Sequence, residues 1–276
     1  TAVAAVAAVA SPARSGGQIA GAFEHTFGSK GTKNGKFKFP RGVAVAGDLV
    51  FVADEKNNRV SVHRLDGKFV FAFGSKGQGD GEFRSPIGVA VANDRVFFGD
   101  SDNHRVSVHQ LDGTFEFAFG SEGEGDGEFN SPNCVAVASD RLFVADALNC
   151  RVSVHQLDGT FVFAFGSEGD MLCPVDGEFF CIMGVAVADG LVYVLDQSKR
   201  GIAVHNALDG AYVRAVGSRG DGEGEFSYPQ GIAVAGDHMF VVDRSKDRVA
   251  VHRLDGSFVG SFGRSGRGDG ELFGPD

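Results

Sequence analysis

Five of the eight histidines in the chain occupy the same place in a recurring phrase, which raises the question of a metal or catalytic site. The phrase reads RVSVH at residues 59–63, 105–109 and 151–155, GIAVH at 201–205 and RVAVH at 248–252. Histidine is the commonest metal ligand and a frequent general base. A zinc site requires every ligand nitrogen to lie within about 2.1 Å of one zinc ion. Whether the five histidines can form one site therefore depends on the distances between the strands that carry them.

The phrase belongs to a longer unit that is used five times. An anchor reading GVAVA, CVAVA or GIAVA begins every 46 to 50 residues, at Gly42, Gly88, Cys134, Gly184 and Gly231. Repeats of this length, rich in short alternating strands, are typical of propeller blades.

Period-2 alternation and turn residues predict four strands in each unit. In the first unit these strands cover 42–46, 49–54, 59–63 and 68–74. Because neighbouring strands lie about 4.8 Å apart, the third strand sits roughly 10 Å beyond the innermost one. Equivalent histidines of adjacent blades are then on the order of 15 Å apart and cannot share one ion. We therefore predict that they occupy a half-buried structural position, either between blades or at the rim, beside the LDG turn.

The fold class predicted is all-β: a propeller of five complete four-stranded blades plus one strand of a sixth. Residues 23–27 match an outermost strand with no partner strands before it. We expect the partner strands to lie beyond Asp276, or the ring to be gapped or to close as five. The blades are expected over about 42–73, 88–119, 134–165, 184–216 and 231–262, within a propeller domain of residues 22–276.

The Ala-rich residues 1–21 are predicted to be poorly ordered or helical, with the tail of a signal peptide as the alternative. The four cysteines show no metal-binding spacing, so we expect free thiols, with a Cys173–Cys181 disulfide as the alternative. Cysteine usage leaves the cellular compartment open. No apolar run reaches 18 residues, so no membrane insertion is expected.

The stretch SPIGVAVANDRVFFGDSDNHRVSVHQLDGTFEFAFGSEGEGDGEF, residues 85–129, closely resembles the NHL repeat. The resemblance extends over roughly residues 22–276 and implies a six-bladed β-propeller. It also implies a binding module for protein partners or for single-stranded RNA. Some relatives are peptide-amidating lyases that hold a metal near the ring axis.

The repeats depart from the NHL pattern in four ways. The aromatic that usually ends the third strand is histidine here, and the fourth unit has Gly201 in place of the usual arginine. The fourth unit is also preceded by a longer loop, with DMLCPV at 170–175. An alanine replaces the aspartate that often follows the family's I-A-V, at Ala46, Ala92, Ala138, Ala188 and Ala235. We regard the irregular fourth blade as a favoured place for a specific contact.

Catalysis and cofactor binding are not expected. Each inner strand reads V-A-V-A or I-A-V-A, so the groups that acid–base or metal chemistry needs are missing where they would converge. An axial metal-dependent enzyme of the amidating-lyase type is therefore an unlikely alternative. The GDGE loops offer two carboxylates each, whereas calcium takes six to eight oxygens, so we predict that these loops are turns.

Charge is sorted by blade along the loops that precede the inner strands. The first loop, 28–42, has five cations and no acid, whereas the third and fourth each have four acids and no cation. We predict that this polarised face binds a protein partner of complementary charge. Single-stranded RNA on the basic 28–59 edge is the alternative, although a net charge of −10 argues against general affinity for nucleic acid. The charged residues proposed are Lys30, Lys33, Lys36, Lys38, Glu122, Glu124, Glu168 and Asp170.

A second set of candidate partner residues precedes the anchors. These five positions differ from one another while their surroundings repeat, and they are expected to rim the axial opening. They are Arg41, Ile87, Asn133, Met183 and Gln230. The loops 55–58, 101–104 and 147–150 are expected to extend the same surface.

Overall fold

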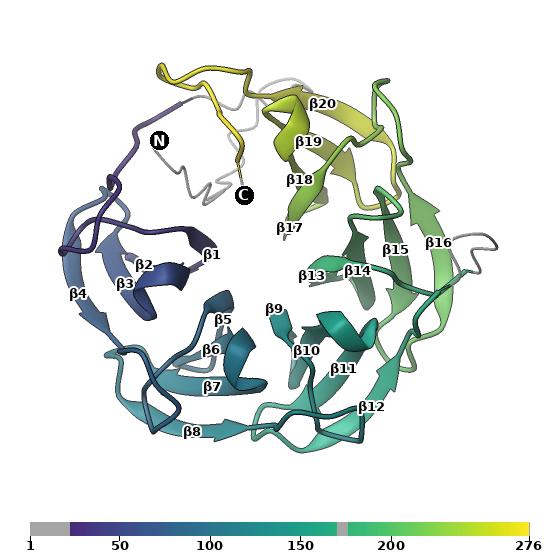
Figure 1. The fold of residues 1–276 in the computed structure, drawn as a ribbon. Coiled ribbons are helices and arrows are strands. Elements are labelled where there is room, and N and C mark those ends of the chain that lie inside the picture. Colours follow the sequence, from purple (N-terminus) through teal and green to yellow (C-terminus); the bar gives the residue numbers. More distant parts are fainter. Residues whose placement is uncertain (1–22, 170–175, 276) are drawn as a thin grey trace.

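A computed structural model describes residues 23–169 and 176–275. The Ala-rich segment predicted over 1–21, the candidate residue Asp170 and Cys173 lie outside the described residues. Over these residues, five antiparallel sheets of four strands radiate from a common axis as propeller blades, with the first and last described segments between the first and fifth blades (Figure 1). The predicted all-β architecture is confirmed.

Within each blade the strands follow chain order from the axis outward. The inner strands are β1 (Pro40–Ala46), β5 (Pro86–Ala92), β9 (Pro132–Ala138), β13 (Ile182–Ala188) and β17 (Pro229–Ala235). The second strands are β2 (Leu49–Asp54), β6 (Arg95–Asp100), β10 (Arg141–Asp146), β14 (Leu191–Asp196) and β18 (His238–Asp243). The third strands are β3 (Arg59–Arg64), β7 (Arg105–Gln110), β11 (Arg151–Gln156), β15 (Gly201–Asn206) and β19 (Arg248–Arg253). The outer strands are β4 (Phe69–Phe73), β8 (Phe115–Phe119), β12 (Phe161–Phe165), β16 (Tyr212–Val216) and β20 (Phe258–Phe262).

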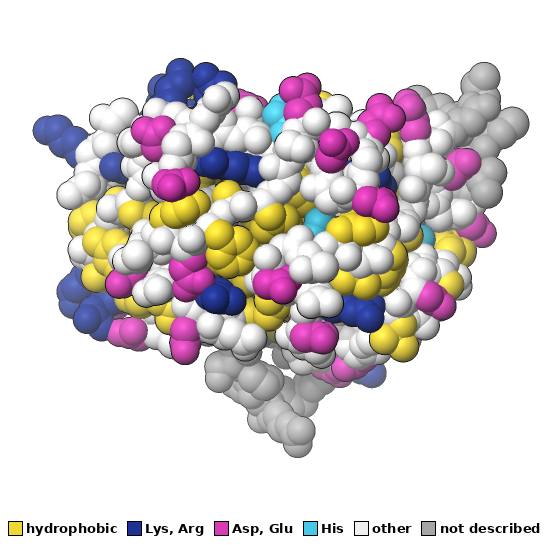
Figure 2. Space-filling model, turned by 90° about the horizontal axis from the view of Figure 1, so that it is seen from below, with side chains coloured by type: hydrophobic (Ala, Val, Ile, Leu, Met, Phe, Trp, Pro, Cys, Tyr) yellow, Lys and Arg dark blue, Asp and Glu magenta, His cyan; other side chains and the backbone are white. Residues whose placement is uncertain are grey.

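Aromatic and branched side chains fill the spaces between adjacent blades. Phe51 packs against blade 2, and Phe97, Phe143 and Tyr193 repeat this contact toward blades 3, 4 and 5. All four side chains are essentially inaccessible to solvent. A single sheet could not bury such a face alone, so the neighbouring blade covers it. Seen edge-on, the ring shows apolar side chains at mid-height between charged upper and lower rims (Figure 2).

The five repeated histidines lie in these interfaces and are at most 1% exposed. In blade 2, the Nδ1–H group of His109 donates to the carbonyl of Gly113 at 3.1 Å, which leaves Nε2 to accept from the Ser107 hydroxyl at 3.0 Å. The ring also contacts Phe73 of blade 1, with 5.0 Å between ring centroids. The predicted structural role beside the LDG turn is therefore confirmed, and the position is the one between blades. The rings are fully buried and not half-buried as predicted, because aromatic side chains such as Phe73 cover them.

Residues 23–27 occupy the place of a sixth outer strand but form no strand ladder. Phe27 packs on His63 with ring centroids 4.9 Å apart, as Phe73 packs on His109. A β-carbon built on Gly270 would lie 3.4 Å from that of Phe23, matching the approach of Phe69 to Gly35 in blade 1. The expected lone strand has the correct position without strand hydrogen bonds, because no neighbouring third strand lies among the described residues.

The anchor glycines allow the inner strands of adjacent blades to approach closely. A β-carbon on Gly88 would lie 2.6 Å from the Cα of Cys134 and 2.8 Å from the amide nitrogen of Val135. Both are backbone atoms, so relief of the contact requires a whole strand to move.

We expect Gly88→Ala to lower the free energy of unfolding by about 3 kcal/mol, through overpacking of two backbones. Gly260→Ala is the control, because a β-carbon there meets nothing within 4 Å. Urea unfolding of both variants tests this. Equal stability of Gly88→Ala and the wild type would show that the glycine is not required by packing.

Candidate interaction face

The loops that precede the inner strands share one face of the ring with those joining the second and third strands. We call the first set leading loops and the second set middle loops. The 3₁₀ turns of four middle loops are η1 (Glu55–Asn57), η2 (Ser101–Asn103), η3 (Ala147–Asn149) and η4 (Arg244–Lys246). The Lys56 amide donates to the carbonyl of Lys38 at 3.0 Å, and the Asp102 amide to that of Arg84 at 3.1 Å. The two sets of loops therefore form one connected surface.

A buried aspartate at the end of the second strand fixes each leading loop. In blade 2 the Asp100 side chain is 0% exposed and accepts the amide of Arg84 at 2.7 Å. It also accepts from Asn103 Nδ2 at 2.7 Å and Arg105 Nε at 3.0 Å. We call this aspartate with its arginine the loop clamp. Its members are Asp54–Arg59, Asp100–Arg105 and Asp146–Arg151.

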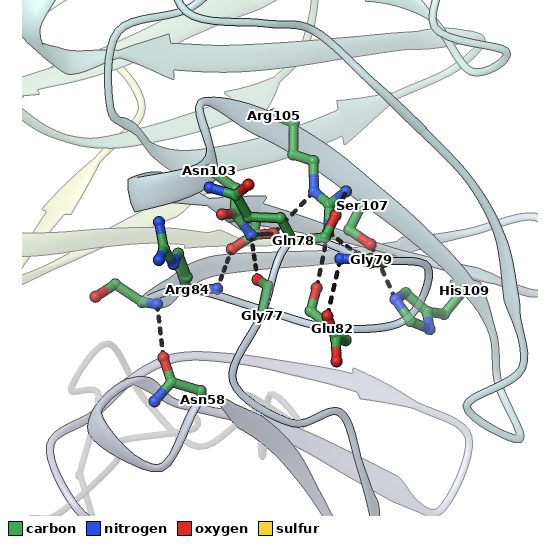
Figure 3. A network of polar contacts seen from close by, with 12 residues as sticks. Asn58, Gly77, Gln78, Gly79, Glu82, Arg84, Asn103, Arg105, Ser107 and His109 are labelled. Atoms are coloured by element: carbon green, nitrogen blue, oxygen red, sulfur yellow. Dashed lines mark hydrogen bonds and ion pairs between the residues drawn. The ribbon is translucent and has the colours of Figure 1, made fainter.

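The arginine of the clamp also holds the turn of the leading loop. Arg105 donates to the carbonyls of Gln78, Gly79 and Glu82 at 2.9, 3.0 and 2.8 Å (Figure 3). The planar guanidinium suits this role because its donors form a rigid fork. Burial raises the pKa of the Asp100 carboxyl, while the hydrogen bonds from Asn103, Arg84 and Arg105 act to lower it.

Blades 4 and 5 use different contacts at this place. In blade 4, where Gly201 replaces the arginine, Asp196 accepts the amides of Phe180 and Ser198, both at 2.9 Å. In blade 5, Lys246 Nζ and Arg248 donate to the Glu225 carbonyl at 3.2 and 2.9 Å. The loop of blade 4 is thus fixed by backbone groups without an arginine clamp.

The GDGE loops are turns, as predicted. Glu82 accepts the amide of Gly79 at 2.9 Å, and Glu128, Glu225 and Glu271 make the same contact in their own loops. The phenylalanine that follows is fully buried in blades 2 to 5. These glutamates stabilise the loops through their own backbone.

Blade 1 has an unusual leading loop. Lys36 stands where blades 2, 3 and 5 have the turn-capping glutamate, and the backbone still turns through a bond from the Lys36 amide to the Lys33 carbonyl at 3.0 Å. Lys30, Lys33, Lys36 and Lys38 are exposed, and none has an acidic partner among the described residues. Arg41 is half-buried, with Nε 3.0 Å from Glu55 Oε2.

Exposed acidic residues lie in the leading loops of blades 3 and 4, as the sequence predicted. Glu122 and Glu124 are exposed in the leading loop of blade 3, and Glu168 is exposed before blade 4. Among the described residues, the leading loops are therefore basic at blade 1 and acidic at blades 3 and 4.

The residues predicted to rim the axis lie at the second position of the inner strands. Ile87 and Met183 are half-buried, whereas Gln230 is only 8% exposed. Asn133 Nδ2 donates to the carbonyl of Ile182 at 2.8 Å, across to the next blade. Their part in partner binding stays a prediction, and contacts within the ring already occupy Arg41 and Asn133.

The exposed aromatics on this face include two at equivalent positions that were not predicted from the sequence. Phe39 is 53% exposed and Tyr228 is 41% exposed, at equivalent positions one residue before an inner strand. The signal available was the contrast between KFKFPRG in blade 1 and the serine that precedes proline in blades 2 and 3.

No group of three or more His, Cys, Asp or Glu residues in the described part of the chain is placed to hold a metal ion. No helix over the same residues is long and apolar enough to cross a membrane. Cys134, Cys150 and Cys181 are free thiols.

Comparison with known proteins identifies the class of protein that this fold defines. The profile of a family described as "6-bladed beta-propeller" matches residues 176–263, and that of the NHL repeat matches residues 37–62. The predicted resemblance to NHL-repeat β-propellers is confirmed.

A solved structure titled "Crystal structure of Nidogen/Laminin Complex" contains a chain of similar fold, with a TM-score of 0.66 and 15% sequence identity. The similarity covers 88% of this chain and 86% of that chain. No curated protein sequence matches the chain significantly.

Proposed function

We propose that the protein is a non-catalytic binding platform that recognises a protein partner through its leading and middle loops. The observation that carries this proposal is the sorting of exposed charge on one connected face. Four exposed lysines with no acidic partner among the described residues lie in the leading loop of blade 1, and exposed glutamates lie in the loops of blades 3 and 4. Complementary charge steers the encounter of proteins and selects among partners.

The loop clamps support this proposal because they fix the shape of the face before a partner arrives. Surfaces that are ordered in advance lose less conformational entropy on binding. The similar chain from the nidogen/laminin complex indicates that a fold of this kind occurs in a protein–protein complex.

A matched pair of charge reversals tests the function. Lys33→Glu, Lys36→Glu and Lys38→Glu together change the proposed face, whereas Arg64→Glu, Lys68→Glu and Arg253→Glu change the opposite one by the same charge. Both variants and the wild type are used as baits in a source-cell extract, and captured proteins are quantified by mass spectrometry. We expect the leading-loop variant to lose a captured protein at least about tenfold, while the opposite-face variant retains it.

Treatment with ribonuclease separates the two kinds of partner. Capture that survives the nuclease supports a direct protein partner. Capture that disappears with the nuclease would favour the single-stranded RNA alternative on residues 28–59. Equal capture by the two charge variants would contradict the assignment of the face.

A further inference from the structure

Phe39 is the most unusual residue of the leading loop in blade 1. It is a bulky aromatic at φ 56°, and its side chain is 53% exposed. Ser85 and Ser131 hold the equivalent positions at φ 53° and 59°, and Ser85 is only 8% exposed. Bulky residues rarely adopt this left-handed conformation, and such backbone strain gathers at functional sites. Packing inside the ring does not require an aromatic here.

The backbone around Phe39 is held on both sides. Its carbonyl accepts the amide of Glu55 at 3.2 Å, and the carbonyl of Lys38 accepts the amide of Lys56 at 3.0 Å. The amide of Lys38 donates to Asp54 Oδ1 at 2.6 Å, inside the loop clamp. Phe39 is followed by the buried Pro40. The aromatic ring is therefore presented to solvent on a fixed support.

The cations of the leading loop of blade 1 and of the adjoining η1 turn fall into two groups. Arg41 and Lys56 both contact Glu55, at 3.0 and 2.5 Å, so their charge is partly balanced within the protein. The ammonium groups of Lys30, Lys33, Lys36 and Lys38 have no acidic partner among the described residues. The loop thus combines one exposed apolar anchor with four uncompensated positive charges.

We propose that the leading loop of blade 1, residues 28–41, docks an acidic segment of a protein partner that places an apolar side chain on Phe39. The lysines receive carboxylates on either side of that side chain. This proposal rests on the function proposed above and specifies the chemistry of the partner at one edge of the face.

The observations favour a peptide over a nucleic acid. Single-stranded RNA binders stack successive bases on several aromatics along a continuous basic groove. Here one aromatic stands within a loop, and acidic loops lie elsewhere on the same face. The whole chain also carries a net charge of −10, which opposes a long polyanion.

Fluorescence anisotropy with defined probes tests the proposal on the intact protein. The first probe is a labelled heptapeptide with phenylalanine between three glutamates on each side. The second has serine in place of phenylalanine, and the third has glutamines in place of the glutamates. A ten-nucleotide oligouridine is the fourth probe.

We expect the phenylalanine peptide to bind best and to weaken as salt is raised. Phe39→Ser should weaken that peptide about fivefold, in keeping with the loss of one aromatic contact, and should leave the serine peptide unchanged. Lys33→Glu, Lys36→Glu and Lys38→Glu together should abolish binding of both acidic peptides. Phe39→Ser introduces the residue that blades 2 and 3 use, and a thermal melt checks its fold.

Two outcomes would overturn the proposal. If Phe39→Ser leaves the affinity for the phenylalanine peptide unchanged, or no acidic peptide binds, the apolar anchor is refuted. If oligouridine binds and the peptides do not, the surface recognises RNA. Partner capture by the matched charge variants, with and without ribonuclease, is measured separately, so loss of this proposal and loss of the proposed function are distinguishable.

Discussion

Replacing Arg105 with methionine is expected to destabilise the protein by about 3–5 kcal/mol, since the buried Asp100 would lose its charged partner. The Asp100 carboxylate is 0% exposed, and Arg105 is its cationic partner at 3.0 Å (Figure 3). The carbonyls of Gln78, Gly79 and Glu82 would lose their common donor. Loss of the clamp should therefore also loosen the leading loop of blade 2.

Urea unfolding at pH 7 measures the first effect, and hydrogen exchange of the amides at residues 77–83 measures the second. Arg105→Lys is the matched control, because it keeps the charge but lacks the planar fork, and we expect an intermediate loss. The double variant Asp100→Asn with Arg105→Met should cost less than the sum of the two single changes. A loss below about 1 kcal/mol for Arg105→Met would mean that the ion pair contributes no more than an exposed one.

The free energy of unfolding is expected to fall as the pH is lowered below about 6.5. Burial lowers the pKa of all five repeated histidines, and their glycine carbonyl acceptors only partly oppose this. Below pH 6.5 the unfolded chain binds protons that the folded chain does not, so stability is lost until the lowered folded pKa is reached. Each histidine contributes at most about 1.4 kcal/mol per pH unit across that window.

The window from pH 7.5 to 5.5 brackets the unfolded histidine value of about 6.5. Burial raises the pKa of Asp100 and Asp146, so these carboxyls take up protons in the folded chain before they do in the unfolded chain as the pH falls, which opposes the loss. His205→Phe should reduce the pH slope by the share of one histidine. That site is suitable because His205 Nε2 has no hydrogen-bond partner among the described residues.

Val204→Ala is the control for His205→Phe, because it removes a buried side chain from the same strand without removing a titratable group. It should lower stability equally at every pH. Chemical denaturation at several pH values gives both slopes. An unchanged slope in His205→Phe would show that this buried ring takes no part in the proton linkage.

The strands, their order within each unit and the structural role of the histidines could be predicted from the amino-acid sequence alone. Period-2 alternation and turn residues depend on local geometry, so each four-stranded unit could be predicted from residues close together in the chain. The spacing of strands then excluded a shared metal ion and left a structural position between blades or at the rim. The buried rings of His109 and its equivalents confirm that interpretation.

The charge that the interaction face presents to solvent could be established only from the tertiary structure. Glu55 is buried and balances Arg41 and Lys56, so two of the cations counted on the basic edge are not free. Glu82 points back to its own turn. A count of charged letters cannot distinguish these groups from Lys33 or Lys36.

Phe39 shows the same limit most clearly. Its sequence neighbourhood looks like that of a core strand, and Phe37, two residues earlier, is indeed buried. Only the fold places Phe39 in solvent, because amides from the middle loop, 16 to 18 residues further along the chain, fix its backbone in a left-handed conformation. Local pattern specified the blades, whereas hydrogen bonds between loops distant in sequence decided which side chains the face presents.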